Sequence, residues 1–115
     1  MDYFMRMWNV NPKILCRKHL LGEHLEMHMF AGSIKKGISL NGFINNGCVE
    51  IHNIKKRHDE LATELSGRMY NHKTPIKESI DDVIGYVDTE QNINELMNRC
   101  PECKERIIEW KKENQ

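Results

Sequence analysis

Two long stretches of the chain carry apolar residues at helical spacing, and they constrain its fold more than any other feature. The first stretch has Ile14, Leu21, Leu25 and His28 or Met29, and the second has Ile51, Ile54, His58, Leu61 and Leu65. Recurrence at steps of three and four residues is typical of one face of an α-helix. Asn11 is a favoured N-cap and Pro12 a favoured first helical residue. We therefore predict helices over residues 12 to about 31 and about 50–67.

The rest of the chain is also predicted to be helical or irregular. Asn45-Asn46-Gly47 would end a short helix at about 40–46, residues 71–75 read as a loop, and residues 76–87 fit no clear pattern. Asp88 or Thr89 would cap a helix over 90–99, and Pro101 would open the last helix. Alternation typical of a strand is confined to a few residues near 47–51. The prediction is an all-α, compact single-domain helical bundle with long loops, spanning residues 1–115.

Charge is uneven along a chain whose formal net charge is zero. Residues 1–76 hold 11 Lys and Arg against 7 Asp and Glu, whereas residues 77–115 hold 6 against 10. A basic front part can face a phosphate backbone while an acidic tail stays away from it. We find neither a long apolar run nor the features of a signal peptide, so we expect a cytoplasmic protein without a membrane partner.

The first predicted helix carries His19, Glu23 and Glu26 at spacings of four and three, which places them on one face. Without other information, such a face is solvated, with Arg17 and Lys18 as nearby counter-charges. An amine near the start of the chain would change that interpretation. A primary amine can attack a sugar carbon and form a Schiff base, and a carboxylate can handle the protons and charge of the intermediate.

These residues resemble the pyrimidine dimer DNA glycosylases of phages, viruses and bacteria, also called the endonuclease V family. The resemblance implies a nucleophilic α-amine at the N-terminus and a catalytic glutamate 21 residues later, which matches Met5 and Glu26. It also implies a DNA-contacting arginine after the nucleophile (Arg6), an active-site histidine (His19) and a further glutamate (Glu23). Met5 and Glu26 are thus the expected catalytic residues, whereas Arg6, His19 and Glu23, together with Lys18, are expected to contact the lesion or its phosphates.

A second block, residues 50–73, is similar to the family's basic helix and its exit. Here Arg57 and Arg68 are expected to add backbone affinity, or else to lie on a solvated helix face. Two departures stand out on the first helix, where Leu25 and Met29 replace arginines of the family. The C-terminal third shows no such similarity.

The position of the nucleophile predicts where the active chain begins. Translation from Met5 would place the α-amine where the family needs it, so residues 1–4 are expected to be an extension or a misassigned start. An α-amine has a pKa of about 7.7–8.0 and a lysine about 10.4, so the terminal amine is far more often neutral near pH 7.

Cys100 and Cys103 form a two-residue-spaced pair, which is half of a zinc site. Cys16 and His19 could supply the other half and tie the last helix to the first. The alternative is that the thiols are small buried apolar residues. The glycosylase interpretation needs no metal and no organic cofactor, and it gives His19 a different task.

Three functional hypotheses follow from the sequence. The first is a monomeric DNA glycosylase with abasic-site lyase activity that acts on damaged double-stranded DNA, encoded by a phage, a virus or a bacterium. The second is a catalytically inactive DNA- or protein-binding module on the same scaffold. The third is a zinc-stapled interaction domain.

Overall fold

The computed structural model describes residues 5–71 and 74–114, and within them it contains five α-helices and no strand. The helices are α1 (Arg17–Lys35), α2 (Asn41–Asn45), α3 (Ile54–Gly67), α4 (Thr89–Arg99) and α5 (Pro101–Glu113). Two 3₁₀ turns, η1 (Pro12–Ile14) and η2 (Ile51–Asn53), precede α1 and α3. The all-α prediction is confirmed. The expected extension, residues 1–4, and part of the predicted loop at 71–75 lie outside the described residues.

The first predicted helix is interrupted. Asn11 accepts the Lys13 N–H at 3.0 Å and starts η1, as its N-cap character predicts, but the backbone is extended at Leu15 and Cys16. Cys16 then caps α1, which continues to Lys35. Nothing in the apolar spacing marks this break, because buried apolar residues, Ile14 and Leu20, lie on both sides of it.

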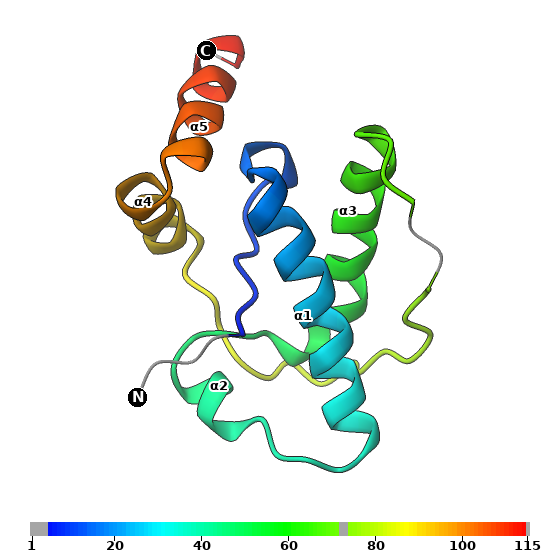
Figure 1. Ribbon diagram of the computed structural model, residues 1–115. Coiled ribbons are helices and arrows are strands. Elements are labelled where there is room, and N and C mark those ends of the chain that lie inside the picture. Colours follow the sequence, from blue (N-terminus) through cyan, green and yellow to red (C-terminus); the bar gives the residue numbers. More distant parts are fainter. Residues whose placement is uncertain (1–4, 72–73, 115) are drawn as a thin grey trace.

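Helices α1 and α3 pack side by side at the centre of the molecule (Figure 1). The apolar stripe chosen for the first helix was wrong, since Leu25 is 60% exposed and Met29 47% exposed. The buried face of α1 instead consists of Leu20, Glu23, Met27 and Phe30. A glutamate occupies the middle of this face, which is why hydrophobicity alone selected the wrong residues.

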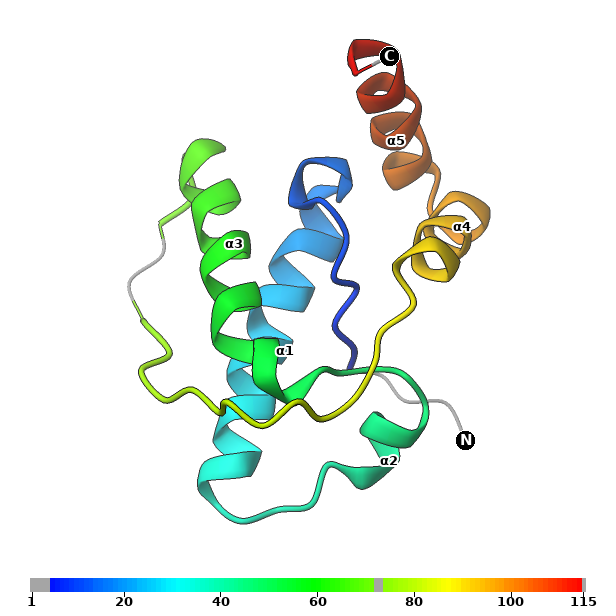
Figure 2. The ribbon, with the colours of Figure 1, turned by 180° about the vertical axis from the view of Figure 1, so that it is seen from behind.

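The N-terminal segment, residues 5–11, runs between α1 on one side and α4 with α5 on the other (Figures 1 and 2). Met7 and Trp8 are buried, and the Met7 N–H donates to the Cys48 carbonyl at 2.6 Å. This segment is therefore an internal element of the fold rather than a loose end.

The loop after α3 brings α4 back to this segment. Gly85 allows its close approach, because it has φ +94° and a Cβ there would lie 2.3 Å from the Val49 carbonyl oxygen. Asp88 accepts the Gln91 N–H and caps α4, and Pro101 opens α5, both as predicted. Among the helices described, none is long and apolar enough to span a bilayer.

Candidate active site

A buried ion pair between Glu23 and Arg57 joins α1 to α3. The Arg57 guanidinium donates to both carboxylate oxygens of Glu23, at 2.6 and 2.9 Å, and to the Val10 carbonyl at 2.6 Å. Both side chains are essentially inaccessible, at about 1% exposed. A bidentate pair with this geometry can offset the large cost of burying two charges, whereas removing either partner would leave an uncompensated charge.

Glu23 also holds the N-terminal segment. Its Oε2 accepts the backbone N–H groups of Trp8, at 3.1 Å, and of Asn9, at 3.4 Å. One carboxylate thereby connects α1, α3 and the segment that leads to Met5. The structure makes Glu23 a positioning residue, because its oxygens are spent on these contacts.

The same segment places the backbone next to Met5 beside Glu26, the second glutamate of α1. The Arg6 N–H donates to Glu26 Oε1 at 2.7 Å. Three covalent bonds separate successive backbone nitrogens and span at most about 4.3 Å, so the Met5 nitrogen lies within about 7 Å of that oxygen. The family resemblance paired Met5 with Glu26, and the fold brings the backbone next to Met5 to the Glu26 carboxylate.

Glu26 is a partly buried carboxyl group with a raised pKa. Burial raises its pKa to about 7, and the nearby Glu23 charge acts in the same direction, although the Arg6 N–H opposes both. A carboxyl that is about half ionised at pH 7 can both accept and return a proton. Gly22 lies one turn earlier, where a Cβ would come 3.6 Å from Glu26 Oε2, so the absence of a side chain leaves space beside the carboxylate.

The Arg6 side chain folds back onto α4. Its guanidinium donates to Glu95 at 2.5 Å and to Asn92 at 2.7 Å, and it stacks 4.0 Å from the centre of the Trp8 ring. The Asn92 amide also donates to the Trp8 carbonyl at 2.8 Å. Helix α4 therefore braces the segment from the side opposite Glu23.

His19 lies about 10 Å along α1 from Glu26, two helical turns away. Its Nδ1 faces Cys16 Sγ at 3.1 Å and Cys103 Sγ at 3.5 Å, and its ring meets that of Trp8 edge-on. Burial lowers the pKa of His19, with Arg99 and Lys18 adding to the effect, so the ring is neutral near pH 7. The structure thus groups His19 with the thiols rather than with Glu26.

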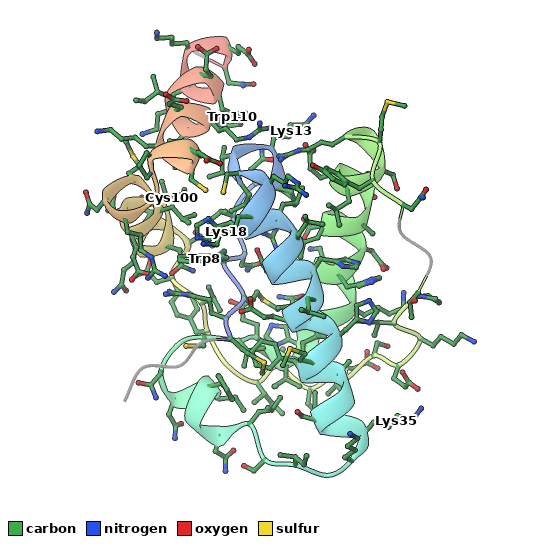
Figure 3. The ribbon with its side chains drawn as sticks, viewed as in Figure 1. Trp8, Lys13, Lys18, Lys35, Cys100 and Trp110 are labelled. Carbon is green, nitrogen blue, oxygen red and sulfur yellow. The ribbon has the colours of Figure 1, made fainter. Side chains whose placement is uncertain are left out.

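The predicted cationic contacts fall into two sets. Lys18 is exposed on the first turn of α1 and can meet a phosphate (Figure 3). Arg68 is largely engaged, donating to Glu64 at 2.8 Å and to the Leu15 carbonyl at 2.9 Å. The expected DNA contact by Arg57 does not fit its burial, and its observed partner, Glu23, has no free oxygen to offer DNA.

The sequence also matches a known protein family. A family model described as pyrimidine dimer DNA glycosylase matches residues 5–78. The chain belongs to this family. No curated protein and no solved structure matches the chain. The match begins at Met5 and includes Glu23, Glu26 and Arg57, but helices α4 and α5 of this pyrimidine dimer DNA glycosylase family member lie outside it.

Sequence reasoning missed three parts of the site. It did not connect Glu23 with Arg57, because their separation of 34 residues hides a contact between two helices. It gave no role to Asn92, whose only sequence signal is a polar residue on the inward face of an amphipathic helix. Gly22 could have been noticed, since a glycine inside a helix costs about 1 kcal/mol relative to alanine and invites an explanation.

Proposed function

We propose that this protein excises pyrimidine dimers from duplex DNA and nicks the resulting abasic site, with the α-amine of a chain that begins at Met5 as nucleophile. Family membership supports the class of enzyme. The observation that carries the proposal is the 2.7 Å hydrogen bond from the Arg6 N–H to Glu26, because it fixes the first residue of such a chain beside a carboxyl of suitable pKa.

The proposed reaction begins when Glu26 takes a proton from the terminal ammonium group. The neutral nitrogen then bonds to C1′ of the damaged nucleotide as the bond from C1′ to the base breaks, and the base leaves with the electron pair. The nitrogen gives one proton to the departing base. Its lone pair then forms the C1′–N double bond as the C1′–O4′ bond breaks, and O4′ takes the proton that Glu26 holds. The product is a protonated imine, whose charge the Glu26 carboxylate stabilises. Glu26 next takes a C2′ proton as the bond to the 3′ phosphate breaks (β-elimination), and hydrolysis of the imine frees the amine.

DNA binding is proposed to use the surface around this site. Lys18 would contact phosphate, and a poorly stacked lesion lowers the cost of flipping the nucleotide toward Glu26. Leu25 and Met29 flank Glu26 along α1 and are exposed, so they offer apolar contact where arginines are expected in the family. Arg6 would support the site in two ways: its contacts with Trp8 and α4 hold the N-terminal segment in place, and its side chain could also contact DNA.

Borohydride trapping tests the nucleophile. Two forms of the protein, beginning at Met1 and at Met5, are incubated with duplex DNA that carries one abasic site. We expect a covalent complex from the Met5 form and little from the Met1 form. Equal trapping by both forms would mean that a lysine, or another group, is the nucleophile.

A nicking assay tests the substrate. The Met5 form should cleave ultraviolet-irradiated duplex and leave unirradiated duplex intact. A duplex containing a single uracil is the control for lesion specificity. Binding to irradiated DNA without any cleavage would instead support an inactive module on the same scaffold.

A further inference from the structure

The four residues Cys16, His19, Cys100 and Cys103 converge where the first turns of α1 and α5 meet. One ligand atom from each lies within 4.8 Å of every other, although Cys16 and Cys100 are 84 residues apart. Figure 3 shows Cys100 at the junction of α4 and α5, and its sulfur lies 3.8 Å from that of Cys16, the N-cap of α1. From this convergence we propose that the protein binds one structural Zn²⁺ through three cysteine thiolates and the Nδ1 atom of His19.

The distances match a tetrahedral site. With Zn–S bonds of about 2.3 Å and a Zn–N bond of about 2.0–2.1 Å, tetrahedral ligands lie about 3.8 Å apart for two sulfurs and about 3.6 Å apart for sulfur and nitrogen. The Cys16 and Cys100 sulfurs are 3.8 Å apart, and His19 Nδ1 is 3.5 Å from Cys103 Sγ and 3.1 Å from Cys16 Sγ. Of these three pairs, only the last must open, by about 0.5 Å, and every other pair already lies within 4.8 Å.

The backbone supports negative charge on all three sulfurs. Each Sγ accepts one N–H: that of His19 at Cys16, that of Cys103 at Cys100, and that of Cys16 at Cys103, at 3.2–3.4 Å. The N-termini of two helices also point at the cluster, and their dipoles favour anionic ligands. Hydrogen bonds to the ligating atoms of this kind orient and stabilise a metal site.

The N-caps give an independent indication. The N-cap residue of both α1 and α5 is a cysteine whose sulfur accepts the N–H three residues later, although Ser, Thr, Asp and Asn are the usual residues there. In each helix the residue at that third position, His19 or Cys103, supplies another ligand. Burial of inert thiols explains Cys103, but it does not explain two capping cysteines aimed at one point.

The site would be structural because four protein ligands leave no open position. It joins α5, which lies outside the family match, to α1, which carries Glu26. Through the edge contact of His19 with Trp8, it also touches the segment that leads to Met5. The proposal does not depend on the proposed glycosylase activity, and its tests measure metal rather than cleavage.

Metal analysis of protein purified without chelators is the first test. We expect about one zinc per chain, a value near zero for a Cys100→Ser/Cys103→Ser variant, and full occupancy for Cys48→Ser, the matched control. Cys48 is buried but lies outside the cluster. Absence of zinc from folded wild-type protein, even after titration with Zn²⁺, would overturn the proposal.

If the Cys100→Ser/Cys103→Ser variant does not fold, cobalt substitution of the wild-type protein identifies the metal ligands instead. Co²⁺ in the wild-type site should show the visible absorption of a tetrahedral ion and charge-transfer bands from sulfur. A competing site is the cluster of His24, His28 and His58, which also converge within 4.8 Å. Bound cobalt without sulfur bands, or metal lost in His28→Asn but retained in the double cysteine variant, would assign the metal to the histidines and refute the inference.

Discussion

Replacing Glu26 with glutamine should make the protein more stable at neutral and alkaline pH while removing its proposed activity. Burial raises the Glu26 pKa from the usual 4.5 to about 7, so the folded protein holds a proton that the unfolded chain has released. A raised pKa contributes stability that is fully present below about pH 4.5 and is lost as the pH rises through 7. The neutral amide avoids that loss, and its oxygen can still accept the Arg6 N–H.

The size of the Glu26 pKa shift determines how much stability the Glu26→Gln variant should gain. At about 1.36 kcal/mol per pKa unit, the full shift corresponds to about 3 kcal/mol. The carboxyl is only partly buried, so solvent screening reduces the expected gain to about 1–2 kcal/mol. For a chain of this size, that gain raises the melting temperature by about 3–8 °C above pH 7.5. Below pH 4.5 the two proteins should melt together.

Thermal melts of both proteins between pH 4 and 8.5 would measure this difference, and Glu109→Gln on the exposed side of α5 is a control for charge removal. Excision by Glu26→Gln should fall about 10²- to 10⁴-fold, with DNA binding retained. A stability difference that does not vary with pH would show that the carboxyl is not desolvated in the folded protein. Unchanged excision would remove Glu26 from the mechanism.

Three further predictions follow from the site. Arg57→Met should lower the free energy of unfolding in urea by about 3–5 kcal/mol, because the Glu23 charge would remain buried without its partner. The exposed Lys56→Met is the control and should have little effect. A loss below about 1 kcal/mol in Arg57→Met would argue against a strongly coupled pair. Lys18→Ala should weaken binding to all duplexes alike and reduce the slope of log affinity against log salt by about 1, and an unchanged slope would place Lys18 away from DNA. Gly22→Ala should raise the stability by about 0.5–1 kcal/mol, since its Cβ would only reach ordinary contact with Glu26, and a lower melting temperature would mean that the position has no room.

Local patterns predicted several element starts because those starts carry a sequence signal. Asn11-Pro12, Asp88 and Pro101 mark the beginnings of η1, α4 and α5, whereas α2 and α3 begin without a side-chain cap. The break at Leu15 and Cys16 was missed because its cause is tertiary. There the chain turns so that Cys16 meets α5, which no local pattern encodes.

The site residues that lie on a single helix, α1, could be predicted from the sequence. Spacing along α1 found His19, Glu23 and Glu26, but it could not tell that Glu23 faces the core, that Glu26 is half-buried, or that His19 faces the thiols. Those differences arise from α3 and α5, which supply Arg57 and Cys103 from distant parts of the chain. Burial, which decides between a positioning and a catalytic carboxylate, is a property of the packed molecule.

Helix α4 lies outside the family match, yet its contacts make it part of the proposed site. Asn92 is 3% exposed, and its amide connects the Arg6 guanidinium to the Trp8 carbonyl. Asn92→Ala would leave both groups without this partner in a buried environment, at a cost of about 1–3 kcal/mol. Because the segment from Arg6 to Trp8 positions Met5, we expect excision to fall while affinity for undamaged duplex stays unchanged. The exposed Asn94→Ala on the same helix is the matched control, and borohydride trapping should fall in parallel with excision. If Asn92→Ala lost stability but kept full excision, Glu23 alone would suffice to hold the N-terminal segment in place.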